Sequence, residues 1–136
     1  MNPLLLDTNA YVAFKRGDSE AVEILQQAPA IYLNAVVLGE LLAGFAAGNR
    51  ADVNRAQLQE FLDLSKVSVL QVDRDTATVY GEVFASLRLA GTPIPTNDMW
   101  IAASAIQSDL ALFSFDSHFR AVSGLACGAS RQSLGG

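Results

Sequence analysis

Strand-like and helix-like patterns alternate along this chain, and that alternation limits its fold more than any other feature. Short apolar runs occur at Leu4–Leu6, Ala30–Leu33, Val67–Val72 and Ala111–Phe115. Between them lie stretches with the apolar spacing of amphipathic helices. Alternating β and α segments favour a parallel sheet, because helices connect parallel strands across the faces of the sheet. We therefore predict an α/β fold of three α/β/α layers with a mostly parallel central sheet.

Local signals predict where the helices begin and end. Residues that commonly cap helix N-termini stand before each expected helix: Asp18 or Ser19, Asn34, Asn49 or Asp52, Asp73, and Thr96 or Asn97. Gly44 and Gly48 are expected to bracket a break, and Gly91 to end a helix. An edge strand is expected at Leu125–Cys127. We expect a single domain over residues 1–136, with about 128–136 as a loose tail because that segment is small and polar.

Composition excludes several classes of protein. Apolar residues make up 51% of the chain, the formal charge is −5 and the pI is about 4.6, which argues against a broad basic face for nucleic acid. Cys127 is the only cysteine, so no internal disulfide can form and a reducing compartment is expected. No signal-peptide pattern is present, and no apolar run reaches the roughly 20 residues of a membrane-spanning helix. We predict a cytoplasmic protein without membrane association.

Four acidic residues stand in apolar surroundings. Asp7 follows three leucines and Asp116 follows the apolar run at 111–115, while Asp98 starts an apolar helix and Glu40 lies between leucines. A carboxylate in such surroundings is costly unless it is solvated, paired or bound to metal. Singly, Asp98 could be a helix cap and Glu40 an exposed helix residue. Because ligands bind at the carboxyl ends of parallel strands, we expect all four to converge there.

The chemistry of such a cluster favours a divalent cation. Two unit charges 4 Å apart repel by roughly 4 kcal/mol at an effective dielectric of 20. A cluster of carboxylates therefore persists only with protons or a cation. Oxygen ligands favour Mg²⁺ or Mn²⁺ over zinc, and either ion can polarise a phosphodiester and activate water for in-line attack. The cation would also let a negatively charged pocket accept a phosphate backbone.

Four segments resemble, in order, the acidic motifs of the PIN domain family, and most closely those of VapC toxins from bacterial toxin–antitoxin pairs. These segments are Leu6–Asn9, Leu38–Leu41, Asn97–Ala103 and Ser114–Phe119, within a resemblance that extends from Leu4 to about Leu125. Each motif alone is weak, but four in order at this chain length make a strong signal. The resemblance implies a parallel-sheet α/β fold and a Mg²⁺- or Mn²⁺-dependent endoribonuclease that hydrolyses RNA with metal-activated water.

The resemblance also implies roles and partners. Asp7, Glu40, Asp98 and Asp116 match the family's catalytic and metal-binding acids. Thr8, Asn9, Asn97 and Ser114 match its supporting polar positions, which orient carboxylates by hydrogen bonds; local turn and cap bonding is the alternative for these four. The implied partners are RNA as substrate, a cognate antitoxin that blocks the groove, and a second copy of the chain in a homodimer.

Two other readings of the sequence stay open. The first is a catalytically silent, PIN-like or receiver-like binding module, which should gain little stability from Mg²⁺ or Mn²⁺. The second is an aspartate-based phosphatase of the haloacid-dehalogenase type. That chemistry needs a second acid two residues after Asp7, where this chain has Asn9.

The remaining charged residues give weaker signals. His118 is the only histidine and lies two residues after Asp116, so an acid–base role is conceivable, although a half-exposed helix position is the simpler account. The nine basic residues are scattered along the chain. Lys15, Arg16 and Arg120 are candidates to contact phosphate at the rim of the site, against the alternative of ordinary solvated charges.

Overall fold

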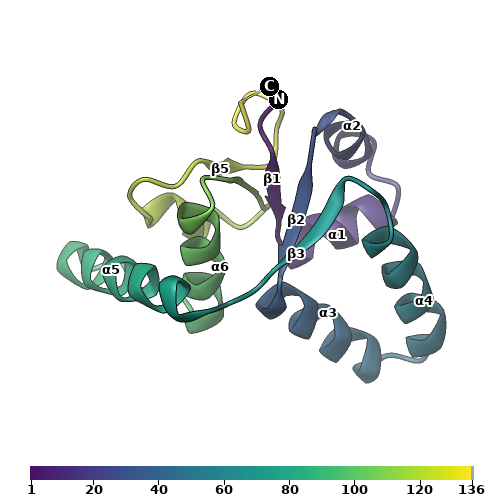
Figure 1. The fold of residues 1–136 in the computed structure, drawn as a ribbon, viewed down its shortest axis with the longest axis horizontal. Coiled ribbons are helices and arrows are strands. Elements are labelled where there is room, and N and C mark those ends of the chain that lie inside the picture. The colour runs from purple at the N-terminus through teal and green to yellow at the C-terminus, as the bar shows by residue number, and fades with distance from the viewer. Residues whose placement is uncertain (136) are drawn as a thin grey trace.

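A five-stranded parallel sheet forms the centre of the molecule, in a computed structural model that describes residues 1–135. The strands are β1 (Leu4–Leu6), β2 (Ile31–Asn34), β3 (Val67–Leu70), β4 (Ala111–Phe113) and β5 (Cys127–Gly128). Their order is β3-β2-β1-β4-β5, and all four pairings are parallel (Figure 1). The shortest strand, β5, begins at the residue where the predicted edge strand ends.

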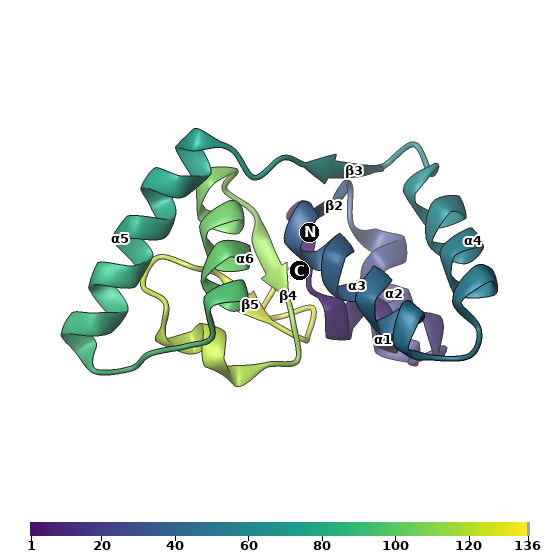
Figure 2. The ribbon, with the colours of Figure 1, turned by 90° about the horizontal axis from the view of Figure 1, so that it is seen from below.

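Helices cover both faces of this sheet. They are α1 (Thr8–Lys15), α2 (Ser19–Gln27), α3 (Ala35–Ala47), α4 (Ala51–Leu62), α5 (Arg74–Ala90), α6 (Thr96–Gln107) and a short 3₁₀ helix, η1 (Ser117–Ala121). Figure 2 shows α5 and α6 on one side of the sheet and α1 and α2 on the other. The predicted three-layer α/β/α arrangement is confirmed. Within residues 1–135, no helix combines the length and apolarity needed to span a bilayer.

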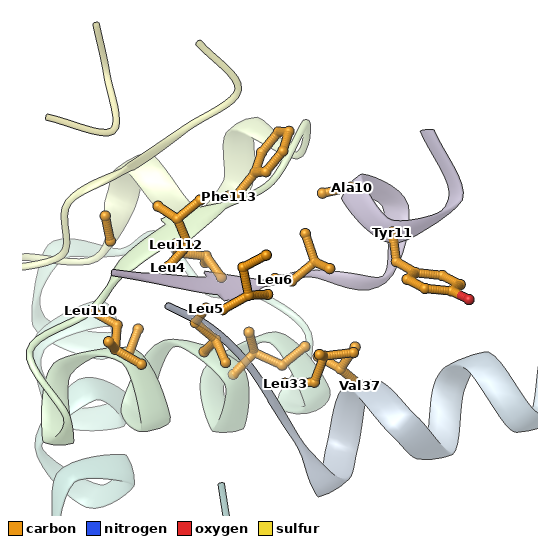
Figure 3. Packing of buried hydrophobic residues seen from close by; sticks show 14 of the residues in the cluster. Leu4, Leu5, Leu6, Ala10, Tyr11, Leu33, Val37, Leu110, Leu112 and Phe113 are labelled. Carbon is orange, nitrogen blue, oxygen red and sulfur yellow. The ribbon is translucent and has the colours of Figure 1, made fainter. Parts of the chain in front are cut away.

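The hydrophobic core is built around β1. Leu4, Leu5 and Leu6 have no exposed surface, since the strand lies between β2 and β4 and helices cover both of its faces. Figure 3 shows these leucines packed against side chains from β2, β4, α1 and α3. A strand buried on both faces has a continuous apolar sequence rather than an alternating one. The three consecutive leucines are therefore the expected sequence for the middle strand of a covered parallel sheet.

Several helix ends lie where local sequence signals place them. The Asp18 and Asn34 side chains accept hydrogen bonds from backbone amides of α2 and α3. Asp73 and Thr76 form a reciprocal capping box at the start of α5. Gly91 ends α5 in a left-handed conformation, with φ of 68°. These predictions are confirmed because each depends on neighbouring residues alone.

Three predicted boundaries are wrong, and tertiary packing explains two of them. Helix α3 ends at Gly48 as predicted but runs through Gly44 without a break, because its inner face packs against α4 and α6 and keeps the glycine helical. Helix α6 begins at Thr96 and has no side-chain cap, since the Asn97 amide bonds to Glu40 instead. Helix α4 starts after Arg50 with neither Asn49 nor Asp52 as its cap.

The C-terminal segment is more ordered than its composition predicts. Leu134 is fully buried in the core, and the Arg131 guanidinium lies 3.1 Å from the Glu23 carboxylate of α2. The expectation of a loose tail is therefore wrong for residues 128–135, because one apolar side chain is enough to anchor a polar segment. Gly136 lies outside the described residues.

The topology marks one edge of the sheet as the natural place for a site. From β1 the chain continues to β2 on one side, whereas β4, on the other side of β1, continues to β5. The connections of the two adjacent strands β1 and β4 thus lead in opposite directions, which opens a crevice at their carboxyl ends. The Asp7 amide donates to the Phe113 carbonyl at 3.0 Å and ties the two strand ends together.

Candidate metal centre

The four acids predicted from the sequence line one cavity of about 540 Å³ at this edge of the sheet. Asp7 ends β1 and caps α1, and Asp98 lies in the first turn of α6. Glu40 projects from the middle of α3, and Asp116 lies beyond β4, where it caps η1. Asp116 is separated from β4 by two residues, so it does not follow the strand directly as the sequence suggested. The structure therefore brings together residues that are up to 109 positions apart in the chain.

Hydrogen bonds hold two of these carboxylates in fixed orientations. The Ser114 hydroxyl donates to Asp7 Oδ2 at 2.6 Å, across the crevice between β1 and β4. The Thr8 hydroxyl donates to Glu40 Oε1 at 2.6 Å, and the Asn97 amide donates to Glu40 Oε2. Glu40 is thus held between α1 and α6 although it lies on α3. Ser114, Thr8 and Asn97 thus each contact a carboxylate of the cavity directly.

Asn9 has a different task. Its side-chain oxygen accepts a hydrogen bond from the Phe115 amide at 3.1 Å, and its amide nitrogen lies 3.5 Å from the Ser114 hydroxyl. Ser114 in turn accepts a hydrogen bond from the Asp116 amide at 3.0 Å. Asn9 therefore fixes the loop after β4, which carries both Ser114 and Asp116. Its side chain acts on the backbone of the site rather than on a carboxylate.

Burial and mutual repulsion make the acids hard to ionise without a cation. Desolvation raises the pKa of Asp98 to about 6, and repulsion from Asp7, Asp116 and Glu40 adds to this effect. Desolvation also raises the pKa of Asp7, although its hydrogen bonds to Ser114 and Thr8 oppose the change. Within residues 1–135, none of the four acids forms an ion pair with a lysine or arginine. The cluster thus lacks the compensating charge that a bound cation would provide.

His118, which the sequence suggested to be an ordinary half-exposed helix residue, contacts this cluster of acids. Its Nδ1 atom is 3.1 Å from the Asp116 carboxylate and 3.8 Å from that of Asp98. One ligand atom from each of these three residues lies within 4.8 Å of the other two, close enough to share an ion. In the sequence, the only signal for this contact is that His118 lies two residues after Asp116. The turn of η1 brings the two side chains together. Asp7 and Glu40 line the same cavity without belonging to this tight group.

The donor set fits Mg²⁺ or Mn²⁺. Carboxylate oxygens are the ligands these ions prefer, and Mn²⁺ also accepts an imidazole nitrogen such as that of His118. A tetrahedral thiolate site for zinc is not available here, because Cys127 lies on β5 and is the only cysteine of the chain.

The fold and the position of the site define a class of protein, and comparison with known proteins gives the same class. The PIN domain model matches residues 4–125, and the chain belongs to the PIN domain family. Among curated relatives, Ribonuclease VapC2 of Rickettsia felis is 30% identical over 79% of this chain and 82% of its own length. Ribonuclease VapC5 of Mycobacterium tuberculosis is 28% identical over 90% of this chain and 89% of its own length.

Solved structures share the fold. The crystal structure of VapBC2 from Rickettsia felis bound to a promoter DNA fragment matches 93% of this chain and 97% of that chain, with a TM-score of 0.82 and 24% identity. The structure of FitAcB from Neisseria gonorrhoeae matches 91% of this chain and 95% of that chain, with a TM-score of 0.74 and 26% identity. The order of strands and helices described above is therefore that of PIN domain proteins.

Proposed function

We propose that this protein is a Mg²⁺- or Mn²⁺-dependent endoribonuclease and the toxin of a toxin–antitoxin pair. One observation carries the proposal: four carboxylates, from the end of β1, the middle of α3, the first turn of α6 and the loop after β4, line one cavity without a lysine or arginine ion pair among the described residues. The ribonuclease names of the curated relatives support the choice of substrate. The same cavity in a PIN domain chain supports the requirement for a divalent cation.

The residues divide the work according to their positions. Asp7, Glu40, Asp98 and Asp116, which line the cavity together, would hold the cation. A bound Mg²⁺ or Mn²⁺ supplies a Lewis acid that polarises the phosphodiester and makes water a stronger nucleophile at neutral pH. Ser114 keeps the Asp7 carboxylate in one orientation, and Thr8 does the same for Glu40. Fixed ligands reduce the reorganisation needed when substrate binds.

Site-directed variants test the proposal directly. Single-stranded RNA is incubated with chelator-treated protein, and cleavage is measured with no added metal, with Mg²⁺ and with Mn²⁺. We expect cleavage only with metal, and its loss in Asp98→Asn and Asp7→Asn while circular dichroism shows a folded protein. Asp63→Asn is the matched control, since Asp63 is exposed at the end of α4 and contacts only the Gln59 side chain through its carboxylate. A folded Asp98→Asn protein that cuts RNA at the parent rate refutes the assignment.

Metal binding without activity separates an enzyme from a silent module. A ligand that binds only the folded state at 100 times its Kd raises stability by about 2.7 kcal/mol. We therefore expect Mn²⁺ to raise the melting temperature of the parent and of Asp63→Asn, but not that of Asp7→Asn. An unchanged melting temperature in the parent at millimolar Mn²⁺ would favour the silent module.

We also propose an antitoxin partner and a cytoplasmic location. The support for the partner is that one structural neighbour is a toxin–antitoxin complex from Klebsiella pneumoniae and another is a member of the VapBC family of toxin–antitoxin systems from Mycobacterium tuberculosis. The test is co-expression with the product of the neighbouring reading frame, followed by co-purification and an RNA cleavage assay. The expected result is a stable complex that does not cut RNA. Failure of the two chains to associate would count against the toxin–antitoxin assignment, though not against the nuclease.

A homodimer completes the proposal. Helix α5 exposes Leu89 to 90% and Phe84 to 45%, and an apolar cavity of about 300 Å³ lies beside them, lined by Phe84, Leu87, Ile94 and Met99 among others. An exposed apolar patch of this kind is typical of an association surface. Light scattering should therefore report a dimer for the parent and a monomer for Leu89→Glu. A monomeric parent at micromolar concentration would contradict the proposal.

A further inference from the structure

Three of the nine basic residues gather in one cavity beside the acidic site. This cationic pocket has a volume of about 440 Å³ and lies between α1, α3 and α4. Its lining includes Lys15, Arg16 and Arg50, and no carboxylate. Within residues 1–135, none of these three cations forms an ion pair. The net charge of the chain is −5, so this pocket is positively charged in a protein that is negatively charged overall.

The cationic pocket is continuous with the acidic cavity. Val12 and Arg16 line both of them, so helix α1 forms a shared wall. Asp7 caps the N-terminus of α1, and Arg16 lies at its C-terminus. At 1.5 Å per helical residue, these two ends are about 13 Å apart. Arg16 lines both cavities, whereas Lys15 and Arg50 line the cationic pocket alone. A strand whose reacting phosphate lies at the acids would thus meet Lys15 and Arg50 at a neighbouring phosphate.

The other side chains of the pocket suit a nucleotide. Phe45 on α3 is half-buried, which leaves part of its ring available for stacking with a base. The amides of Asn54 and Gln57 on α4 also line the pocket, and amide groups can donate and accept hydrogen bonds to bases or sugars. Cations along the backbone and an aromatic ring for stacking are the two elements of single-strand binding, and this pocket has both.

We propose that the cationic pocket holds the RNA strand to one side of the scissile bond, with its phosphates on Lys15, Arg16 and Arg50 and a base against Phe45. This inference rests on the proposed ribonuclease function and adds the path by which the RNA strand reaches the acids. The substrate enters along α1, and the acidic cavity, which repels phosphate in the absence of a cation, receives only the phosphate that reacts. An acidic protein segment is the competing occupant, and the experiment below separates the two.

The test removes two charges that do not line the acidic cavity. Lys15→Gln/Arg50→Gln is prepared in the Asp98→Asn background, and binding of a fluorescent single-stranded RNA is followed by anisotropy from 50 to 200 mM salt. Each lost phosphate contact lowers the slope of log affinity against log salt by about 0.7 for a single strand. We expect the slope to fall by about 1.4 for the double variant, which corresponds to roughly 25-fold weaker binding at 0.1 M salt. Arg55→Gln is the matched control, since Arg55 is exposed on α4 and does not line the pocket.

Kinetics in the active background give a second measurement. Lys15→Gln/Arg50→Gln should raise KM for RNA with little change in kcat, because the pocket binds ground state and transition state alike. A slope and a KM equal to those of Arg55→Gln would overturn the inference while leaving the nuclease intact. So would a double variant that loses its antitoxin but keeps its RNA affinity, because the pocket would then bind protein. If the parent neither binds nor cuts RNA, the proposed function itself fails and the inference fails with it.

Discussion

The clearest quantitative prediction concerns Asp98→Asn in metal-free protein. Burial and three neighbouring acids raise the pKa of Asp98 from 3.8 to about 6. For an acid, a raised folded-state pKa means that the folded protein is relatively stable while the group is protonated. That stability is lost as the pH rises from the unfolded value through the folded value. Asparagine is neutral at every pH, so the substitution should stabilise the metal-free protein at neutral pH.

The structure sets the size of the effect. The difference between 3.8 and about 6 corresponds to about 3 kcal/mol, at 1.36 kcal/mol per tenfold change in proton affinity. Because the cavity is open to water, solvent screening reduces this value, and we expect a gain of about 1–3 kcal/mol at pH 7.5. At pH 4.5, which is much closer to the pKa of 3.8 in the unfolded state, the same relation predicts about one third of the gain in the free energy of unfolding.

Urea denaturation with a chelator present, at pH 7.5 and at pH 4.5, measures both values. Asp63→Asn controls for the general effect of removing one negative charge. The reasoning is refuted if Asp98→Asn is no more stable than the parent at pH 7.5, or if its gain is the same at both pH values. If the result is confirmed, Asp98 lowers the stability of the metal-free protein in order to bind metal, since the same substitution should abolish metal-dependent stabilisation.

Three further predictions each concern a single residue. Ser114→Ala removes the hydrogen bond to Asp7 Oδ2, so titration calorimetry should show metal affinity about 10–100-fold lower. Leu134→Ala should destabilise the protein by about 2–4 kcal/mol in urea, because Leu134 is fully buried, whereas a tail without packing would show no change. Gly91→Ala should cost about 1–2 kcal/mol in the same assay from backbone strain alone, since φ is 68° and an added Cβ meets no atom within 4 Å. An unchanged metal affinity in Ser114→Ala would contradict the orienting role of its hydrogen bond, and an unchanged stability in Gly91→Ala would contradict the strain argument.

Interactions between near neighbours made much of the fold predictable. Asp18, Asn34 and Asp73 cap helices whose first amides lie within three residues of them, so no knowledge of the rest of the molecule was needed. The leucines of β1 predict a strand buried on both faces for the same kind of reason, because their spacing alone leaves no polar side. The four acids could be selected from fourteen because each ends, starts or lies within an apolar segment.

Long-range contacts decided what local signals could not. Asn97 resembles a helix cap in the sequence, but in the structure it binds Glu40, which is 57 residues away, and α6 begins without a cap. Leu134 lies in a polar segment of the sequence, yet in the structure it is fully buried in the hydrophobic core. Whether such a side chain caps a helix, faces solvent or contacts a distant residue depends on partners that only tertiary packing supplies.

What the sequence by itself determined is the set of elements and the acids next to their apolar segments, since both follow from hydrophobic burial and backbone capping within a few residues. What only the tertiary structure decided is the neighbourhood of those acids. The strand order β3-β2-β1-β4-β5 places Ser114 beside Asp7, and the packing of α1, α3 and α4 gathers Lys15, Arg16 and Arg50 into one pocket. Strand order and helix packing are set by the burial of the whole core, which no short stretch of sequence encodes.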